Sequence, residues 1–381
     1  MDFALDELHS TIQKTARAFA QNEVLPHATS WDREERFPKE IVPKLSELGF
    51  LGIRIPEEYG GSGLATLAYS IIVEEIARAD GSLALTVASH NGLGTAHILA
   101  FGDEGQKKRW LPRLATGEML GAWALTEPGS GSDAAGMATT AVRRGDRWVL
   151  NGTKMFITQG SVGGVCVVLA LTTPERKQRG ITAFAVEHGT PGMRPSKHLE
   201  KLGMRSSDTV ELVFEDVEIG DDQRLGALDM GFIDTLKILD RGRVSIASLA
   251  LGLGEAALDM AVRYAKDRKQ FGKPISDFQA IQWMVADMRT ELDAARLLVW
   301  RAAVLADSGE RYSREASMAK LYASEVATRA CNKALQIHGG YGYTREFVVE
   351  RHLRDAKLCE IGEGTSEVQR LVIARSILNV A

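Results

Sequence analysis

The stretch Arg147-Trp148-Val149-Leu150-Asn151-Gly152-Thr153-Lys154-Met155-Phe156-Ile157-Thr158 decides the fold, because it lies in a strand-patterned region of a chain that is otherwise patterned for helices. From about residue 121 the period of the apolar residues changes to two, which is the period of a half-buried strand. An Asn-Gly pair favours a tight turn with positive φ, so we expect a β-hairpin whose turn is Asn151-Gly152.

Three further segments near this stretch have strand character. Val165–Leu171 is a short, nearly continuous apolar run rich in valine, as a buried strand should be. Ile181–Val186 and Val210–Phe214 also have the alternation of strands, with Val210, Leu212 and Phe214 on one face. Connections rich in Gly, Pro and Ser separate these segments. Together they predict a small antiparallel β-domain in the middle of the chain.

Both flanks of this region are patterned for helices. On the N-terminal side apolar residues recur at helical spacing from Leu5 onward, and Pro26 is expected to end the first helix or the next turn. The C-terminal side predicts long helices over residues 232–268, 278–306, 313–338 and 347–358, and a last one after Gly364. Long helices with short connections indicate a four-helix bundle.

The predicted fold is therefore mainly α with a central β-domain. We expect an N-terminal helical domain, a middle antiparallel β-barrel or sandwich and a C-terminal four-helix bundle, over residues 1–118, 119–226 and 227–381.

Composition and charge exclude several classes of function. The 381 residues carry a net charge of −4, which gives no reason to expect nucleic-acid or membrane-surface binding. Cys166, Cys331 and Cys359 are far apart, so neither a disulfide framework nor a metal site is predicted. The acidic N-terminus lacks an apolar signal core, and no long uncharged apolar run predicts membrane insertion. We expect a cytoplasmic protein, or one of an organelle matrix from which a targeting segment was removed.

Glu363 is the first candidate for chemistry. It stands between Gly362 and Gly364 at the entrance to the last predicted helix, where Thr365 or Ser366 supplies the N-cap. Glycines let a backbone approach a ligand closely, and a helix N-terminus presents free N–H groups. Glu363 is therefore either a base aimed at a reacting C–H or a solvated loop glutamate before a capped helix.

A second chemically suggestive segment is Trp123-Ala124-Leu125-Thr126-Glu127-Pro128-Gly129-Ser130-Gly131-Ser132-Asp133. It leaves a strand-like run and enters a turn that offers hydroxyls and backbone N–H groups to a ligand. It lacks the Gly-Lys-Ser/Thr ending of a phosphate-binding P-loop. By itself it is compatible with a ligand-binding loop or with an ordinary one.

With these segments in view, the chain resembles the acyl-CoA dehydrogenase flavoprotein family over nearly its whole length. Each matching motif is short, but their order on an α-β-α frame is specific. The motifs are Leu125–Asp133, Asn151-Gly152-x-Lys154-x-Phe156-Ile157-Thr158, Phe214–Val217, Asp240-Arg241-Gly242-Arg243, Arg268-x-x-Phe271-Gly272, Gln336–Gly342, Arg354-Asp355 and Glu363-Gly364-Thr365-Ser366-Glu367.

The resemblance implies FAD as the cofactor. It places the backbone of Leu125 and Thr126 at the polar edge of the flavin, Phe156 against its rings, and Thr158 near its reactive nitrogen. Many relatives carry a tryptophan where this chain has Phe156. The implied cofactor-binding residues are Trp123, Leu125, Thr126, Gly131, Ser132, Phe156, Ile157, Thr158, Arg268, Phe271, Gln279, Gln336, Ile337, His338, Gly339, Gly340, Thr365, Ser366 and Glu367.

In this comparison Arg268, Phe271 and Gln279 bind the pyrophosphate and adenosine side of FAD. Gln336–Gly340 contact the same cofactor from a neighbouring subunit, because the family shares FAD across a dimer interface. Gly339-Gly340 also suits a helix C-cap, and both roles are compatible. His338 is expected to be a structural histidine at a helix end rather than a base.

The resemblance also implies substrate-binding residues for an acyl-CoA, namely Ser132, Asp240, Arg243 and Gly364. Asp240 and Arg243 equally suit an i,i+3 salt bridge on a helix face. Arg351, Arg354 and Asp355 are expected to form surface or interface ion pairs.

The implied reaction is α,β-dehydrogenation of an acyl-CoA thioester to trans-2-enoyl-CoA. Glu363 removes the α-proton and a hydride passes to FAD, while hydrogen bonds to the thioester oxygen stabilise the developing charge. Some relatives place the base on the helix near Asp240, but the presence of Glu363 favours the common arrangement. Electrons then pass to an electron-transfer flavoprotein, and the enzyme is a homotetramer built as a dimer of dimers.

Gly362 replaces a tyrosine that many relatives carry, which suggests room for bulkier acyl groups among short or medium chains. Two alternatives stay open: an acyl-CoA oxidase that reoxidises FAD with oxygen, and a non-catalytic flavin- or CoA-binding scaffold.

Overall fold

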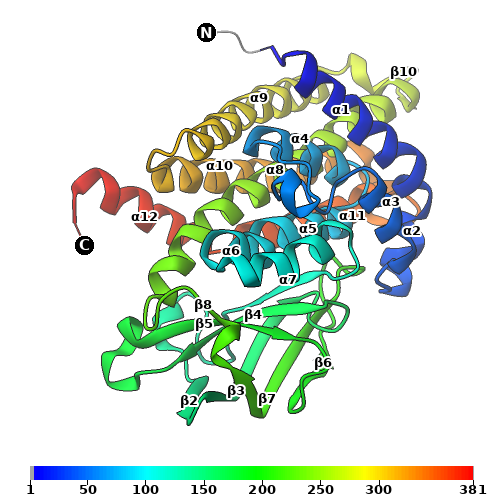
Figure 1. The fold of residues 1–381 in the computed structure, drawn as a ribbon. Helices are drawn as coiled ribbons and strands as arrows, with labels where there is room; N and C mark the ends of the chain where they lie inside the picture. The colour runs from blue at the N-terminus through cyan, green and yellow to red at the C-terminus, as the bar shows by residue number, and fades with distance from the viewer. Residues whose placement is uncertain (1–3, 381) are drawn as a thin grey trace.

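The computed structural model describes residues 4–380, in which helices precede and follow a central β-domain (Figure 1). The N-terminal helices are α1 Glu7–Phe19, α2 Leu25–Glu34, α3 Val42–Glu47, α4 Thr66–Ala77, α5 Gly81–Ser89, α6 Thr95–Phe101 and α7 Glu104–Ala115. Pro26 does not interrupt the helical path: a π-helical turn over Ala20–Val24 joins α1 to α2. Pro26 lies in the first turn of α2, where a missing N–H costs nothing.

The central sheet is largely antiparallel, with strands in the order β6-β7-β3-β2-β4-β5-β8. Its strands are β1 Gly121–Ala124, β2 Thr140–Arg144, β3 Arg147–Thr158, β4 Val165–Leu171, β5 Ile181–Glu187, β6 Met193–His198, β7 Thr209–Gly220 and β8 Arg224–Leu225. Two pairings are parallel: β1 lies beside β4, and β2 meets β4 at Thr140 and Leu171. The sheet is therefore mixed.

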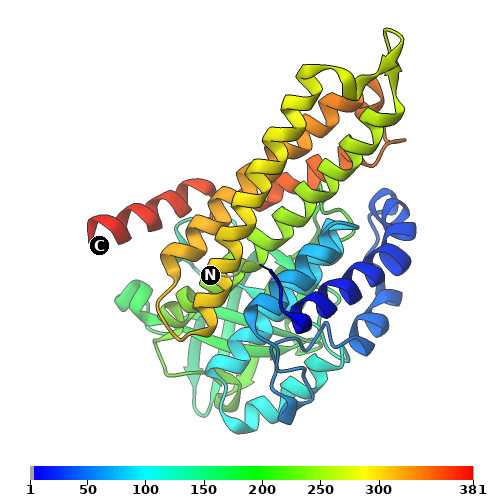
Figure 2. The ribbon, with the colours of Figure 1, turned by 90° about the horizontal axis from the view of Figure 1, so that it is seen from above.

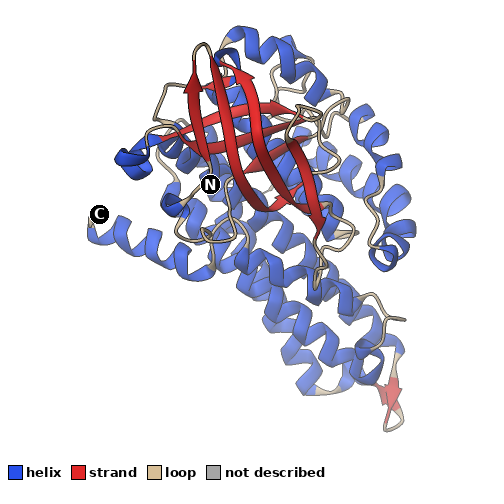
Figure 3. Cartoon of the chain, turned by 90° about the horizontal axis from the view of Figure 1, so that it is seen from below, coloured by secondary structure: helices blue, strands red, loops and turns tan. Residues whose placement is uncertain are grey.

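The sheet folds over on itself, so that its two parts cross one another in Figure 3. Apolar residues of β3 and β7 pack against those of β4 and β5, including Leu150, Ile157, Leu212, Phe214, Val168 and Phe184. The other face of β4 and β5 packs against α7 through Trp110, Leu111 and Leu114. This arrangement gives the middle domain a core of its own and attaches it to the N-terminal helices.

The expected hairpin turn at Asn151-Gly152 is wrong, because β3 is one strand that continues through both residues. The pairing register with β7 shifts there, so the Asn-Gly pair marks a β-bulge. The Asn151 side chain binds Asp216, which has a left-handed φ of 48°. A Cβ at Gly152 would lie 2.4 Å from Thr139 Oγ1, so close packing requires glycine here.

The C-terminal helices are α8 Gly231–Asp267, α9 Gln279–Asp307, α10 Ser313–His338, α11 Val349–Ile361 and α12 Ser366–Leu378. A short two-stranded arm of β9 Lys269–Gln270 and β10 Lys273–Pro274 joins α8 to α9. Figure 2 shows α8, α9 and α10 side by side and α12 diverging at the C-terminus. Although α8 is long and apolar enough to span a membrane, its most apolar window is 89% buried inside the protein. It is the core helix of the bundle.

Residues of α11 connect all three parts of the structure. The expectation of surface or interface ion pairs is wrong for Arg351 and Asp355, whose side chains are buried and form no ion pair within residues 4–380. Asp355 Oδ1 accepts the Met204 N–H at 2.5 Å from the β6–β7 connection. Arg354 donates to both carboxylate oxygens of Asp32 in α2. These contacts fix the β-domain and the N-terminal helices to the bundle.

We predict that Asp355→Asn stabilises the protein more at pH 8 than at pH 5. Burial, together with the nearby Asp80 carboxylate, raises the pKa of Asp355 to about 7. A carboxyl with a raised pKa contributes stability below its unfolded-state pKa and loses it as pH rises through the folded-state value. The measurement is the change in Tm, variant minus wild type, at both pH values.

Asp146→Asn is the matched control, because Asp146 lies in the exposed β2–β3 turn. A Tm change for Asp355→Asn that is equal at both pH values, or more negative at pH 8, would contradict the prediction.

Candidate active site

The carboxylate of Glu363 lies against the backbone of α8. Any Cβ at Gly242 would stand 1.7 Å from Glu363 Oε2, so only glycine leaves room for the carboxylate. Oε2 is buried and has no hydrogen-bond partner among residues 4–380. The chain reaches this position through left-handed backbone at Glu363 (φ 54°) and Gly364 (φ 96°). Glu363 is therefore not a solvated loop residue, although Thr365 does cap α12 by accepting from Val368 N–H.

Burial raises the pKa of Glu363 to about 7, and the positive charges of Lys320 and Arg243 act against that rise. The loop is anchored from two helices. Lys320 Nζ of α10 donates to the Gly364 carbonyl at 2.6 Å, and the Gln369 side-chain amide of α12 donates to the same oxygen at 2.9 Å. A buried carboxyl with a pKa near neutrality is suited to proton transfer.

Asp240 and Arg243 form the i,i+3 ion pair, at 2.6 Å, but they do so in a buried position rather than on an exposed helix face. Asp240 also accepts the hydroxyl of Ser313 at the start of α10. Arg243 Nε is buried, and no hydrogen-bond partner for it occurs in the described part of the chain. The Asp240–Arg243 pair of α8 is therefore connected to the start of α10 through Ser313.

Beside this pair is a basic cavity of about 510 Å³ between α8, α10 and α12. The sequence analysis does not predict this cavity, because Arg375 is about sixty residues from Arg311 and Arg314 along the chain. The only local signal is Arg311-x-Ser313-Arg314 at the start of α10, which by itself suits a solvated helix start. The lining residues are Leu236, Arg311, Ser313, Arg314, Val372, Arg375, Ser376, Asn379 and Val380.

The loop after β1 is attached to β3 by a buried ion pair. Lys154 Nζ donates to Glu127 Oε1 at 2.7 Å and to the Leu125 carbonyl at 3.0 Å. Met155 N–H donates to the Thr126 carbonyl at 2.8 Å. Among the predicted residues, Leu125 is buried and Thr126 is half-buried. The loop is thus a rigid edge beside β3.

Phe156 lies exposed at this edge. Its ring is 65% exposed, and its φ of 61° is left-handed. The neighbouring Ile157 side chain lies in the sheet core, so only its backbone is available to a ligand. An exposed aromatic ring on strained backbone fits a planar heteroaromatic group such as the flavin of FAD.

The other predicted residues of this half differ in exposure. Thr158, Trp123 and Thr365 are half-buried, Ser366 is buried, and Gly131, Ser132 and Glu367 are exposed. Trp123 Nε1 is 3.3 Å from His97 Nδ1.

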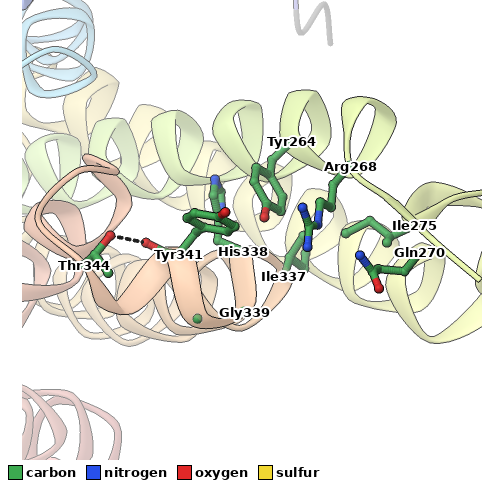
Figure 4. A pocket seen from close by; sticks show the side chains of 10 residues that line it. Tyr264, Arg268, Gln270, Ile275, Ile337, His338, Gly339, Tyr341 and Thr344 are labelled. Atoms are coloured by element: carbon green, nitrogen blue, oxygen red, sulfur yellow. Dashed lines mark hydrogen bonds between the residues drawn. The ribbon is translucent and has the colours of Figure 1, made fainter.

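A second group of predicted residues lines a cavity of about 540 Å³ at the far end of the bundle (Figure 4). The Arg268 guanidinium lies over the Tyr341 ring at 5.5 Å. His338 stacks on Tyr264 at 4.3 Å and contacts the Ala334 carbonyl through Nδ1, which suits a structural role. The lining residues are Tyr264, Arg268, Gln270, Ile275, Ile337, His338, Gly339, Gly340, Tyr341 and Thr344.

Three further predicted residues lie near this cavity without lining it. Phe271 is 92% exposed on the arm, and Gln279 and Gln336 are exposed on α9 and α10. Arg268 and Phe271 are exposed, and a Cβ added at Gly339 or Gly340 would touch nothing. This surface fits a phosphate-bearing ligand that approaches from outside the chain.

The two groups lie in different parts of the fold, one at the edge of the middle domain and the other beyond the end of α8. Gly242, against which Glu363 lies, and Arg268 are 26 residues apart, which is about 39 Å along a straight helix at 1.5 Å per residue. Arg268 shares its cavity with Ile337 and Gly339, so it groups with the residues expected to act on a neighbouring subunit.

Comparison with known proteins covers the whole chain. Family models described as acyl-CoA dehydrogenase, N-terminal domain, middle domain and C-terminal domain match residues 6–118, 122–217 and 229–378. A probable acyl-CoA dehydrogenase of Bacillus subtilis is 48% identical over 99% of this chain and 100% of its own. The mitochondrial short-chain specific acyl-CoA dehydrogenase of Bos taurus is 47% identical over 98% of this chain and 91% of its own.

Solved structures agree. Butyryl-CoA dehydrogenase from Megasphaera elsdenii superimposes with a TM-score of 0.98 at 42% identity, covering 99% of this chain and 100% of its own. A chain in a structure described as the electron transferring flavoprotein of Acidaminococcus fermentans gives 0.98 at 44% identity, with 99% and 100% covered. The chain belongs to the acyl-CoA dehydrogenase family, whose members are FAD-dependent flavoproteins.

Proposed function

We propose that this enzyme converts a short acyl-CoA thioester to trans-2-enoyl-CoA, with Glu363 as the base that removes the α-proton. The observation that carries the proposal is the buried Glu363 carboxylate, which has an unpaired Oε2 and a pKa raised to about 7. A base with a pKa near the operating pH is both ionised and strong enough to accept a proton. Its unpaired oxygen leaves that acceptor free for the substrate.

The chain's own residues bind and orient the reactants. Phe156, with the backbone of Leu125 and Thr126, supports the flavin, and exclusion of water around Glu363 strengthens hydrogen bonds to the thioester oxygen. FAD, when bound, accepts the electrons and the hydrogen that leave the β-carbon of the substrate. Arg268 and Gln336–Gly340 bind the adenosine side of the FAD of a neighbouring subunit.

The basic cavity is proposed to hold the phosphates of coenzyme A. Arg311, Arg314 and Arg375 offer guanidinium groups to phosphate oxygens. Ser313 links this cavity to Asp240, and hence to the buried pair beside Glu363. A CoA thioester bound there would have its nucleotide at the arginines and its acyl end at the base.

The relatives support a short acyl chain on the substrate. They also support the two other kinds of partner, further copies of this chain and an electron-transfer flavoprotein. Two of the relatives are named for short-chain or butyryl substrates, and a Cβ at Gly362 would meet only Leu358 at 3.5 Å or more. That space suits branched as well as straight short chains. We propose a homotetramer, arranged as a dimer of dimers, that passes its electrons to an electron-transfer flavoprotein. The soluble enzyme is proposed to be cytoplasmic, or located in an organelle matrix.

We predict that butyryl-CoA and isobutyryl-CoA bleach the flavin absorbance of the purified enzyme under anaerobic conditions, whereas palmitoyl-CoA does not. The measurement is a titration with butyryl-, isobutyryl-, isovaleryl-, octanoyl- and palmitoyl-CoA. A flavin that no thioester bleaches would refute the proposed reaction. Rapid reoxidation of the bleached enzyme by oxygen would identify an oxidase, and a purified folded protein without flavin would support the scaffold.

We predict that Glu363→Gln keeps FAD but lowers kcat by about a thousandfold, the scale of losing an essential base. The same variant should raise Tm at pH 8 more than at pH 5, because a carboxyl with a raised pKa destabilises the folded state once it is ionised. Turnover close to wild type would exclude Glu363 as the base.

We predict that Arg311→Ala and Arg375→Ala each raise KM for butyryl-CoA by about tenfold, the scale of one charge-assisted hydrogen bond. Neither should change KM for butyryl-pantetheine, which lacks the nucleotide phosphates. Arg144→Ala, at the exposed end of β2, is the control. Equal effects on both substrates would place the phosphates elsewhere.

A further inference from the structure

The loop that carries Glu363 is held in an unfavourable backbone conformation. Glu363 has a φ of 54° and Gly364 a φ of 96°, and a side-chain-bearing residue rarely adopts the left-handed region. Such a conformation persists only where the surrounding structure imposes it. Something other than the local sequence must therefore stabilise this loop.

Two side chains from different helices donate hydrogen bonds to the carbonyl groups of the loop. The Gln369 amide donates to the Glu363 carbonyl at 3.2 Å and to the Gly364 carbonyl at 2.9 Å. Lys320 Nζ donates to the Gly364 carbonyl at 2.6 Å. Both Lys320 and Gln369 are fully buried. Two consecutive peptide units are thus anchored by donors from α10 and α12.

These hydrogen bonds to the carbonyls also orient the N–H groups of the same peptides. A trans peptide directs its N–H opposite to its C=O, and no cis peptide occurs in the described chain. Because both carbonyls point toward the Lys320 and Gln369 donors, the N–H groups of Gly364 and Thr365 point away from them. The hydrogen bonds to the two carbonyls therefore hold the N–H groups of Gly364 and Thr365 on the opposite side of the loop.

Lys320 and Arg351 are the two buried cations within residues 4–380 that form no ion pair, and Arg351 instead donates to Thr29 and the Ala79 carbonyl. Within residues 4–380, no carboxylate lies within ion-pair distance of the Lys320 ammonium group, and its hydrogen-bond partner is the neutral Gly364 carbonyl. Burying a cation without a paired anion is costly. The buried cations Lys154 and Arg243 each have a carboxylate partner at 2.6 to 2.7 Å. Unlike Arg351, Lys320 contacts the loop that carries Glu363 and acts electrostatically on its carboxylate, so its unpaired charge lies at the site.

We propose that Lys320 and Gln369 are positioning residues for proton abstraction, and that they clamp the Glu363 and Gly364 carbonyls so that the carboxylate stays against α8 at Gly242. This inference rests on the proposed function of Glu363. The two residues differ in one respect, since Lys320 adds a positive charge and Gln369 does not. Charge and geometry can therefore be separated by experiment.

The groups that face this site determine the expected pH dependence. Glu363 is faced by Lys320 and Arg243, with Tyr69 of α4 also within its electrostatic reach. Lys320 is faced in addition by Cys359 and Glu360 of α11, and burial lowers the pKa of Lys320 to about 8. Lys320 is therefore protonated near pH 7, where Glu363 titrates, and its charge favours the carboxylate form.

The test compares Lys320→Met with Gln369→Met, two substitutions by the same unbranched apolar side chain. Both variants should lower kcat by about tenfold to a hundredfold, because a small misplacement of the base is costly. Only Lys320→Met should also move the acid limb of kcat/KM upward, by about one pH unit, as expected for loss of a nearby opposite charge. Lys320→Arg should return the acid limb close to its wild-type position.

A second readout does not need turnover. The infrared band of the protonated Glu363 carboxyl, identified by its absence from Glu363→Gln, reports the pKa of Glu363 in ligand-free protein. It should shift upward in Lys320→Met and stay in place in Gln369→Met. A folded, FAD-loaded Lys320→Met with wild-type kcat, acid limb and infrared titration would overturn the proposal.

The outcomes also separate this inference from the proposed function. If Glu363→Gln retains turnover, the assignment of the base fails and the clamp has no catalytic role. If that variant is inactive and both methionine variants are fully active, only the clamp is refuted. Should Lys320→Met not fold, Gln369→Met decides the question, because wild-type kcat in that variant would contradict positioning by the carbonyl contacts.

Discussion

The approach of the Glu363 carboxylate to the backbone of α8 is the contact on which the site depends. It requires glycine at position 242, since any Cβ would occupy the carboxylate's place. It also requires left-handed backbone at Glu363, which extended or helical conformations would not provide. The helices of the bundle and the loop before α12 must therefore be correctly placed relative to one another before the Glu363 carboxylate can reach this position. A buried carboxyl with a raised pKa results from that placement rather than from the local sequence.

Buried polar groups are concentrated where separate parts of the chain meet. Lys154 and Glu127 attach the β1 loop to β3, while Asp355 joins α11 to the β6–β7 connection. Lys320 joins α10 to the loop that carries Glu363. Each group loses hydration on folding, and each recovers only the hydrogen bonds that a correctly assembled neighbour supplies. These contacts make the geometry of the site sensitive to the relative placement of the domains.

The predicted cofactor residues lie in two places because α8 separates them. The edge formed by the β1 loop and Phe156 belongs to the same chain as Glu363, whereas Arg268 and the residues after α10 line a cavity at the other end of the helix. In the proposed assembly, this cavity completes the cofactor site of a neighbouring subunit. The same proposal accounts for Phe271, an aromatic residue of the arm that is 92% exposed.

The sequence by itself determined the order of helical and strand-rich regions, because hydrophobic period is a local property. It also identified Glu363 and the motifs around it, since a carboxylate between glycines before a capped helix is visible in a short window. The tertiary structure alone decided that Asn151-Gly152 forms a bulge, that Arg311 and Arg375 share a cavity, and that Lys320 reaches the loop. These features depend on contacts between residues remote in sequence, and such contacts leave no periodic signal because they arise only when the helices and the sheet pack together.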